Sequence, residues 1–265
     1  KIINVKRTYS RYNRGIKMKK YKNRMVIKIE GTSFIGKQKN GSVFFFLFVS
    51  ILADIQNMGY ELILIPSGAL TAGMDTLSMK TRPENIRQKQ MAAVVGQCSM
   101  LDLYDSFFND YNKVIAQVLL NAEDIKSAEK KKNLSDTINT LLEMGIIPIV
   151  NTNSIAGCIE PRTKELLFED DDMLAVVIAA LCKTHKLIVL SDVFFPYKKI
   201  FQNINIRELS LTAKTSIGKK YQSLKNEKQE FRKKMSALKA AESCGVETTI
   251  LNIGNLPSLY EVIKN

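Results

Sequence analysis

Histidine, the side chain that enzymes use most often as an acid–base catalyst, is scarce in this chain of 265 residues. The chain has no tryptophan and a single histidine, His185, which lies in the charged stretch Lys183–Lys186. We expect His185 to occupy an exposed loop. The sequence therefore argues against a histidine general base and against a Ser-His-Asp triad.

The sequence also lacks the usual signs of disulfide, metal or membrane frameworks. Its four cysteines form neither a CxxC pair nor a regular pattern of spacings, which fits a reduced, cytoplasmic setting. The apolar run Val43–Ala53 ends at Asp54, and its eleven residues fall short of the ~18 that a membrane span needs. We expect a buried helix there. The basic N-terminal stretch has no apolar segment typical of a secretory signal.

The net charge of +13 comes from two segments. Residues 1–24 contain ten Lys or Arg and no Asp or Glu, and residues 214–239 contain nine Lys or Arg and two Glu. Like-charge runs are usually solvated, so we expect residues 1–24 to form a disordered tail. A nucleic-acid surface is the alternative, although no known nucleic-acid-binding motif accompanies these segments. Steep salt dependence of binding would support that alternative.

Apolar segments and helical patterns alternate along the rest of the chain. Strands are predicted at 24–29, 61–65, 114–118, 146–150, 186–190 and 247–251. Helices are predicted at 42–58, 83–110, 127–144, 170–182, 222–244 and 257–264, with Gly96 interrupting the second. This alternation predicts one α/β domain over residues 25–265, a three-layer αβα sandwich with a mainly parallel central sheet. Ligands bind beyond the carboxyl ends of the strands in such sheets.

Small and polar residues follow several of the predicted strands. Lys28 precedes residues 31–33 (GTS), where an ammonium group and backbone N–H groups can bind phosphate, although an ordinary turn has the same residues. Residues 67–73 (SGALTAG) permit either close approach of a ligand or tight packing of a helix. Asp170–Asp172 open a helix, where carboxylates can bind an ammonium group or Mg²⁺, or simply cap the helix.

Several motifs together resemble the glutamate 5-kinases of the amino-acid kinase family. The similarity covers roughly residues 25–265, and its clearest segments stand in the same order and near-spacing. They are residues 26–29 (VIKI) with 31–33 (GTS), 65–73 (IPSGALTAG), 90–97 (QMAAVVGQ), 116–120 (AQVLL), 133–141 (NLSDTINTL), 147–153 (IPIVNTN), 168–174 (FEDDDML) and 190–192 (LSD).

The resemblance implies transfer of a phosphoryl group from ATP to the side-chain carboxylate of L-glutamate, the first step of proline biosynthesis. It assigns catalysis to Lys28 and Asp172. Glutamate would be bound by Ser67, Gly68, Asn151, Ser154 and Asp171. The nucleotide would be bound by Lys28, Gly31, Ser191, Asp192 and Lys239. Mg²⁺ would bridge the phosphates without dedicated protein ligands, and the enzyme would be a homo-oligomer in the cytoplasm.

The sequence departs from the family pattern near the nucleotide phosphates. Glu30 is an extra residue between Lys28 and the GTS turn, and Ser154 replaces an acidic residue. The Gly-rich run and the Thr-Lys that follows it are missing from residues 232–239, where Lys233, Lys234 or Lys239 could supply charge instead. Two hypotheses follow. The chain is a kinase with altered loops, or it is a catalytically impaired relative with a regulatory or binding role.

Overall fold

The computed structural model describes residues 21–30, 41–153, 171–191, 204–205 and 227–264. Its centre is a seven-stranded sheet with the strand order β3-β4-β2-β1-β5-β7-β6. Neighbouring strands run parallel, except for β6 against β7, which confirms the mainly parallel sheet. The strands are β1 (Tyr21–Ile29), β2 (Glu61–Pro66), β3 (Ile115–Leu120), β4 (Ile147–Thr152), β5 (Thr184–Ser191), β6 (Ile204–Asn205) and β7 (Glu247–Asn252).

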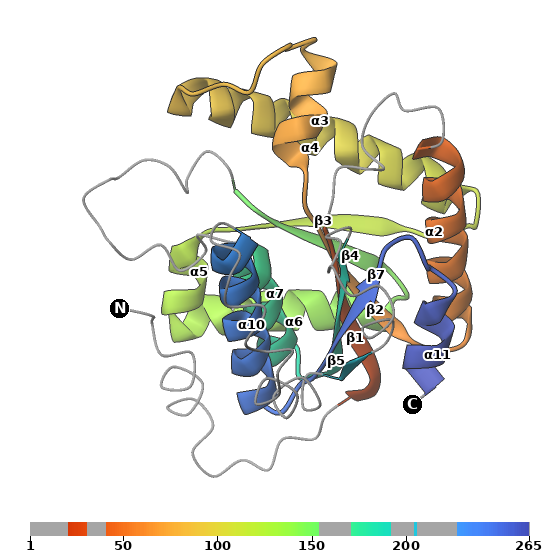
Figure 1. Cartoon of the computed structure of the whole chain (residues 1–265). Coiled ribbons are helices and arrows are strands. Elements are labelled where there is room, and N and C mark those ends of the chain that lie inside the picture. The colour runs from red at the N-terminus through yellow and green to blue at the C-terminus, as the bar shows by residue number, and fades with distance from the viewer. Residues whose placement is uncertain (1–20, 31–40, 154–170, 192–203, 206–226, 265) are drawn as a thin grey trace, which may run out of the picture.

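Helices cover both faces of the sheet, which confirms the three-layer αβα sandwich (Figure 1). One face packs against α2 (Gly41–Asn57), α4 (Ile86–Asn109) and α11 (Ser258–Lys264). The other face packs against α6 (Ala128–Glu143), α7 (Asp171–Leu181) and α10 (Glu227–Ser243). Two short helices, α3 (Ala69–Thr76) and α5 (Ala122–Lys126), follow β2 and β3.

Alternate residues of each central strand enter two separate apolar layers. In β1, Ile27 belongs to the layer under α2 and α4, whereas Val26 belongs to the layer under α6 and α7. This follows from the two-residue period of a strand, because successive side chains point to opposite faces. Both layers are apolar, as expected for a parallel sheet that is covered on both sides.

The structure corrects some of the expected element boundaries. Strand β1 begins at Tyr21, within the segment expected to be a tail, and His185 lies in β5 rather than in a loop. The apolar run near residue 45 is a helix, as predicted, and it buries one face that includes Phe45 and Phe48. Within the described ranges, no helix has both the length and the apolar character that a membrane span requires.

Gly96 does not interrupt α4, contrary to the prediction. The helix continues through it, and Gly96 lies where α4 crosses α3. A Cβ atom on Gly96 would lie 1.7 Å from the carbonyl oxygen of Ala69, and one on Gly73 would lie 1.6 Å from that of Ala92. Only glycine permits so close an approach of two backbones. The small residues of the 67–73 segment therefore serve helix packing at Gly73.

Candidate functional site

The candidate site lies at the carboxyl end of β1 and β5, beneath the first turn of α7. Lys28 and Glu30 follow Val26 by two and four residues, and alternate residues of an extended chain point to the same side. They therefore point to the face covered by α7 and α10. Ser191 is two residues after Val189 and four after Leu187, so it points to the same face from β5. The side chains at the ends of these parallel strands thus lie together at the carboxyl edge of the sheet, where this fold binds its ligands.

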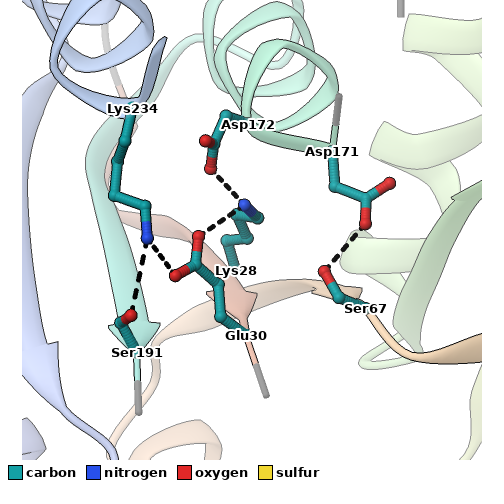
Figure 2. A network of polar contacts seen from close by, with 7 residues as sticks. All are labelled: Lys28, Glu30, Ser67, Asp171, Asp172, Ser191 and Lys234. Carbon is teal, nitrogen blue, oxygen red and sulfur yellow. Dashed lines mark hydrogen bonds and ion pairs between the residues drawn. The ribbon is translucent and has the colours of Figure 1, made fainter. Parts of the chain in front are cut away.

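Four charged side chains meet there (Figure 2). The Lys28 ammonium group donates to the Glu30 carboxylate at 2.6 Å and also to the Asp172 carboxylate. Lys234, from α10, donates to the second oxygen of Glu30 and lies 3.4 Å from the Ser191 hydroxyl oxygen. We call Lys28, Glu30, Asp172 and Lys234 the charge cluster. Lys28 and Asp172, the two residues that the sequence predicts to be catalytic, both belong to it.

All four groups of the charge cluster are largely withdrawn from water, with side chains between 5% and 12% exposed. Burial opposes ionisation of Glu30, but the Lys28 and Lys234 ammonium groups outweigh it and hold the pKa of the carboxyl at about 2. Burial also acts to lower the pKa of Lys28, and Glu30 and Asp172 more than offset that effect, so its pKa is raised. Lys28 and Glu30 are therefore both ionised at neutral pH. The formal charges of the cluster, two lysines and two carboxylates, cancel.

A second pair joins the end of β2 to the start of α7. The Ser67 hydroxyl donates to the Asp171 carboxylate at 2.8 Å, one residue before Asp172 of the charge cluster (Figure 2). Gly68 follows with a φ of +105°, a conformation that L side chains rarely adopt, and it is the N-cap residue of α3. The sequence-predicted residues Ser67, Gly68 and Asp171 thus lie beside one another.

Asn151 lies at the end of β4 but on a different face. It points to the same face as the alternate residues Ile147 and Ile149, which pack under α2 and α4. Its side chain accepts a hydrogen bond from the Thr152 N–H at 2.8 Å. The side chain of Gln97, from α4, donates to the Thr152 carbonyl oxygen at 2.8 Å. Asn151 therefore flanks the carboxyl edge of the sheet on the side opposite Lys28.

Lys234, rather than Lys239, is the α10 lysine that reaches the charge cluster. Lys239 is exposed, and it lies about 140° around the helix from Lys234. Lys234 occupies one stripe with the buried residues Ala237, Leu238 and Ala241, at spacings of three, four and seven. That periodicity is present in the sequence and was the available signal for choosing Lys234. The predicted residues Gly31, Ser154 and Asp192 lie outside the described residues.

The described residues contain no group of three or more His, Cys, Asp or Glu side chains that could hold a metal ion. Glu30 and Asp172 both accept from lysines instead. Mg²⁺ commonly binds through one or two carboxylates together with substrate phosphates, so the cluster itself does not form a complete metal site.

The chain belongs to the amino acid kinase family, whose sequence model matches residues 23–252. Among its relatives is the glutamate 5-kinase of Clostridium perfringens, 41% identical over 173 residues, which cover 64% of this chain and 63% of that protein. The glutamate 5-kinase of Streptococcus agalactiae is 36% identical over 173 residues, with 64% of each chain covered. The match thus spans less than two thirds of the length of these relatives.

Solved structures independently support the fold. Carbamate kinase from Giardia matches with a TM-score of 0.57 at 12% identity, over 89% of this chain and 95% of that one. Isopentenyl phosphate kinase from T. acidophilum, in a product complex, matches with a TM-score of 0.53 at 12% identity, over 90% and 94%. At such identities the similarity concerns the arrangement of the elements and carries no information about the substrate.

Proposed function

We propose that this protein is a glutamate 5-kinase, which transfers the γ-phosphoryl group of ATP to the side-chain carboxylate of L-glutamate. The observation that carries the proposal is the pairing of buried Lys28 with Asp172 beside the Ser67–Asp171 pair. A cationic group for phosphate and a polar group for an amino acid thus lie next to each other at the carboxyl edge of the sheet. The relatives named glutamate 5-kinase support the choice of substrate.

The described groups of the site suit this reaction. The glutamate carboxylate is ionised at neutral pH and attacks the γ-phosphorus directly, so no general base is required. The bond from the γ-phosphorus to the bridging oxygen breaks, and ADP leaves with that electron pair. Lys28 would stabilise the negative charge on the transferring group, and Asp172 would hold Lys28 in position. Asp171, oriented by Ser67, would bind the substrate ammonium group.

Mg²⁺ would enter with ATP, held by the phosphates, and would neutralise part of their charge. Asn151, Gly68 and Ser154 would complete the glutamate site. Gly31, Ser191, Asp192 and Lys239 stay proposed nucleotide contacts. The product, γ-glutamyl phosphate, would enter proline synthesis. We also propose that the protein is a homo-oligomer. We propose a reducing, cytoplasmic compartment, because Cys182 and Cys244 are buried and form no disulfide bond among the described residues.

The test is ATP- and Mg²⁺-dependent formation of glutamyl hydroxamate from L-glutamate and hydroxylamine, which traps an acyl phosphate. Lys28→Met should reduce the rate at least about 100-fold, because a charge that stabilises the transition state is lost. Lys186→Met is the matched control. Lys186 is also a buried lysine paired with a carboxylate, Glu247, but it lies near the opposite end of the sheet. Its variant should keep the wild-type rate.

Absence of hydroxamate from wild-type protein with a folded circular dichroism spectrum would refute the proposed activity. That outcome would favour the hypothesis of a catalytically impaired relative. Equal rates for wild type and Lys28→Met would instead refute the role of Lys28 while leaving the activity intact.

A further inference from the structure

The Glu30 carboxylate lies between two lysine ammonium groups that come from different parts of the chain. One oxygen accepts from Lys28 at 2.6 Å, and the other accepts from Lys234 of α10 (Figure 2). The backbone of Glu30 is fixed as well, because its N–H donates to the Leu190 carbonyl oxygen at 2.8 Å. Glu30 is thus a bidentate anion at the end of β1, on the sheet face that α7 and α10 cover.

A phosphate group would seek the same donors. Lysine ammonium groups bind phosphate as point charges, and each bond to an ionised oxygen is a charge-assisted hydrogen bond. Lys28 and Lys234 give two positive charges to the charge cluster, and Glu30 and Asp172 balance them. A phosphate that enters this balanced cluster brings excess negative charge, unless one of the carboxylates withdraws.

Glu30 is the carboxylate that can withdraw. Asp172 is held in the first turn of α7, where the positive end of the helix dipole favours a negative charge. Glu30 follows the last residue of its strand and has a longer side chain, so a change of side-chain rotamer is enough to carry its carboxylate away from both lysines.

We propose that Glu30 is an internal counter-anion that occupies the place of a nucleotide phosphate between Lys28 and Lys234, so that the nucleotide must displace it. It follows that Lys234 is a second phosphate-binding lysine. The inference rests on the proposed function, because that function identifies the ligand as a nucleoside triphosphate. It predicts that Glu30 weakens nucleotide binding and that its effect depends on Lys234.

The experiment is titration calorimetry of the full chain with a non-hydrolysable ATP analogue and Mg²⁺. Glu30→Gln should lower the Kd about tenfold, because the competing anion is removed. Glu61→Gln is the matched control, since Glu61 also pairs with a buried cation, Arg24, but at the opposite end of the sheet. It should leave the Kd unchanged. An unchanged or higher Kd for Glu30→Gln overturns the proposal.

Two further variants separate displacement from simple charge repulsion. Glu30→Asp keeps the charge but is too short to bridge both lysines, so it should lower the Kd as well, whereas pure repulsion predicts the wild-type Kd. Lys234→Met should raise the Kd about tenfold, and Glu30→Gln added to it should lower the Kd much less than it does alone. Additive effects would overturn the proposal. Unfolding midpoints in urea establish that each variant is folded.

The calorimetric result is independent of the acceptor substrate. If the predicted changes in Kd are observed but no glutamyl hydroxamate forms, the identity of the acceptor is refuted and the counter-anion is supported. If hydroxamate forms but Glu30→Gln binds the nucleotide no more tightly than wild type, the kinase stands and the counter-anion is refuted.

Discussion

Acidification should weaken the fold through Glu30, and the structure gives the size of the effect. The pKa of Glu30 lies at about 2 in the folded protein, against an ordinary value of 4.5. A folded-state pKa below the unfolded one stabilises the protein above the unfolded pKa, and this stability is lost as the pH falls toward the folded pKa. The difference between the two values corresponds to about 3 kcal/mol at pH 7.

Urea unfolding of wild type and Glu30→Gln at pH 7 and at pH 3, followed by far-ultraviolet circular dichroism, measures this contribution. Glutamine is nearly isosteric but does not titrate, so the variant removes the pH-dependent part. The difference in unfolding free energy should be about 3 kcal/mol at pH 7 and should fall to about half of that at pH 3. Below pH 2 the two proteins should converge.

A difference that is the same at both pH values would refute the argument, because Glu30 would then not titrate between its unfolded and folded pKa values. Salt is a second control. Charges on the surface are screened at high ionic strength, whereas largely buried pairs are screened much less. The difference at pH 7 should therefore persist in 0.5 M NaCl (about a 4 Å screening length). Its disappearance would show that the charge cluster is open to solvent.

Three other substitutions test separate parts of the structure. Gly96→Ala should lower the free energy of unfolding by about 2 kcal/mol or more, because its methyl group would meet the Ala69 carbonyl at 1.7 Å; an unchanged urea midpoint would exclude this crossing. Arg24→Met should cost about 3 kcal/mol, since Glu61 loses its partner at 2.6 Å; a smaller loss in the Glu61→Gln background would confirm the coupling. Ser67→Ala should raise the KM for L-glutamate about tenfold with little change in kcat; a selective loss of kcat would instead place Ser67 at the phosphoryl transfer.

The layers and the order of the elements could be predicted because they depend on strong local signals. Strands such as residues 61–65 are nearly continuous apolar runs, and the helices between them have apolar stripes of the right period. The α3–α4 crossing could not be predicted in the same way. Gly96 weakens a helix by its intrinsic propensity, and only the position of α3 shows that its missing side chain is required.

The site was predictable where one strand end supplies the residue. Lys28, Ser67 and Ser191 each follow from the rule that ligand groups gather at the carboxyl ends of parallel strands. Lys234 is different, because it approaches from a helix 204 residues away from Glu30 in the chain. Motif order favoured Lys239, but the apolar stripe of α10 faces the sheet, and Lys234 belongs to that stripe. The helical period explains why Lys234 reaches the charge cluster, and Lys239 stays a proposed nucleotide contact.

Glu30 and Lys234 also change how the departures from the family pattern should be weighed. Read along the sequence, an added carboxylate near the phosphate site and a missing Gly-rich, lysine-bearing run are two separate losses. In the folded chain the added carboxylate and a lysine of the altered segment bind each other. Lys234 without Glu30 would place a second buried positive charge near Lys28 with no carboxylate to balance it. Glu30 without Lys234 would neutralise Lys28 and so weaken its attraction for a phosphate. Together, Glu30 and Lys234 keep the formal charges of the cluster balanced, and a phosphate that displaces Glu30 finds two lysines. The two departures are therefore better explained as one coupled change than as decay of a binding site.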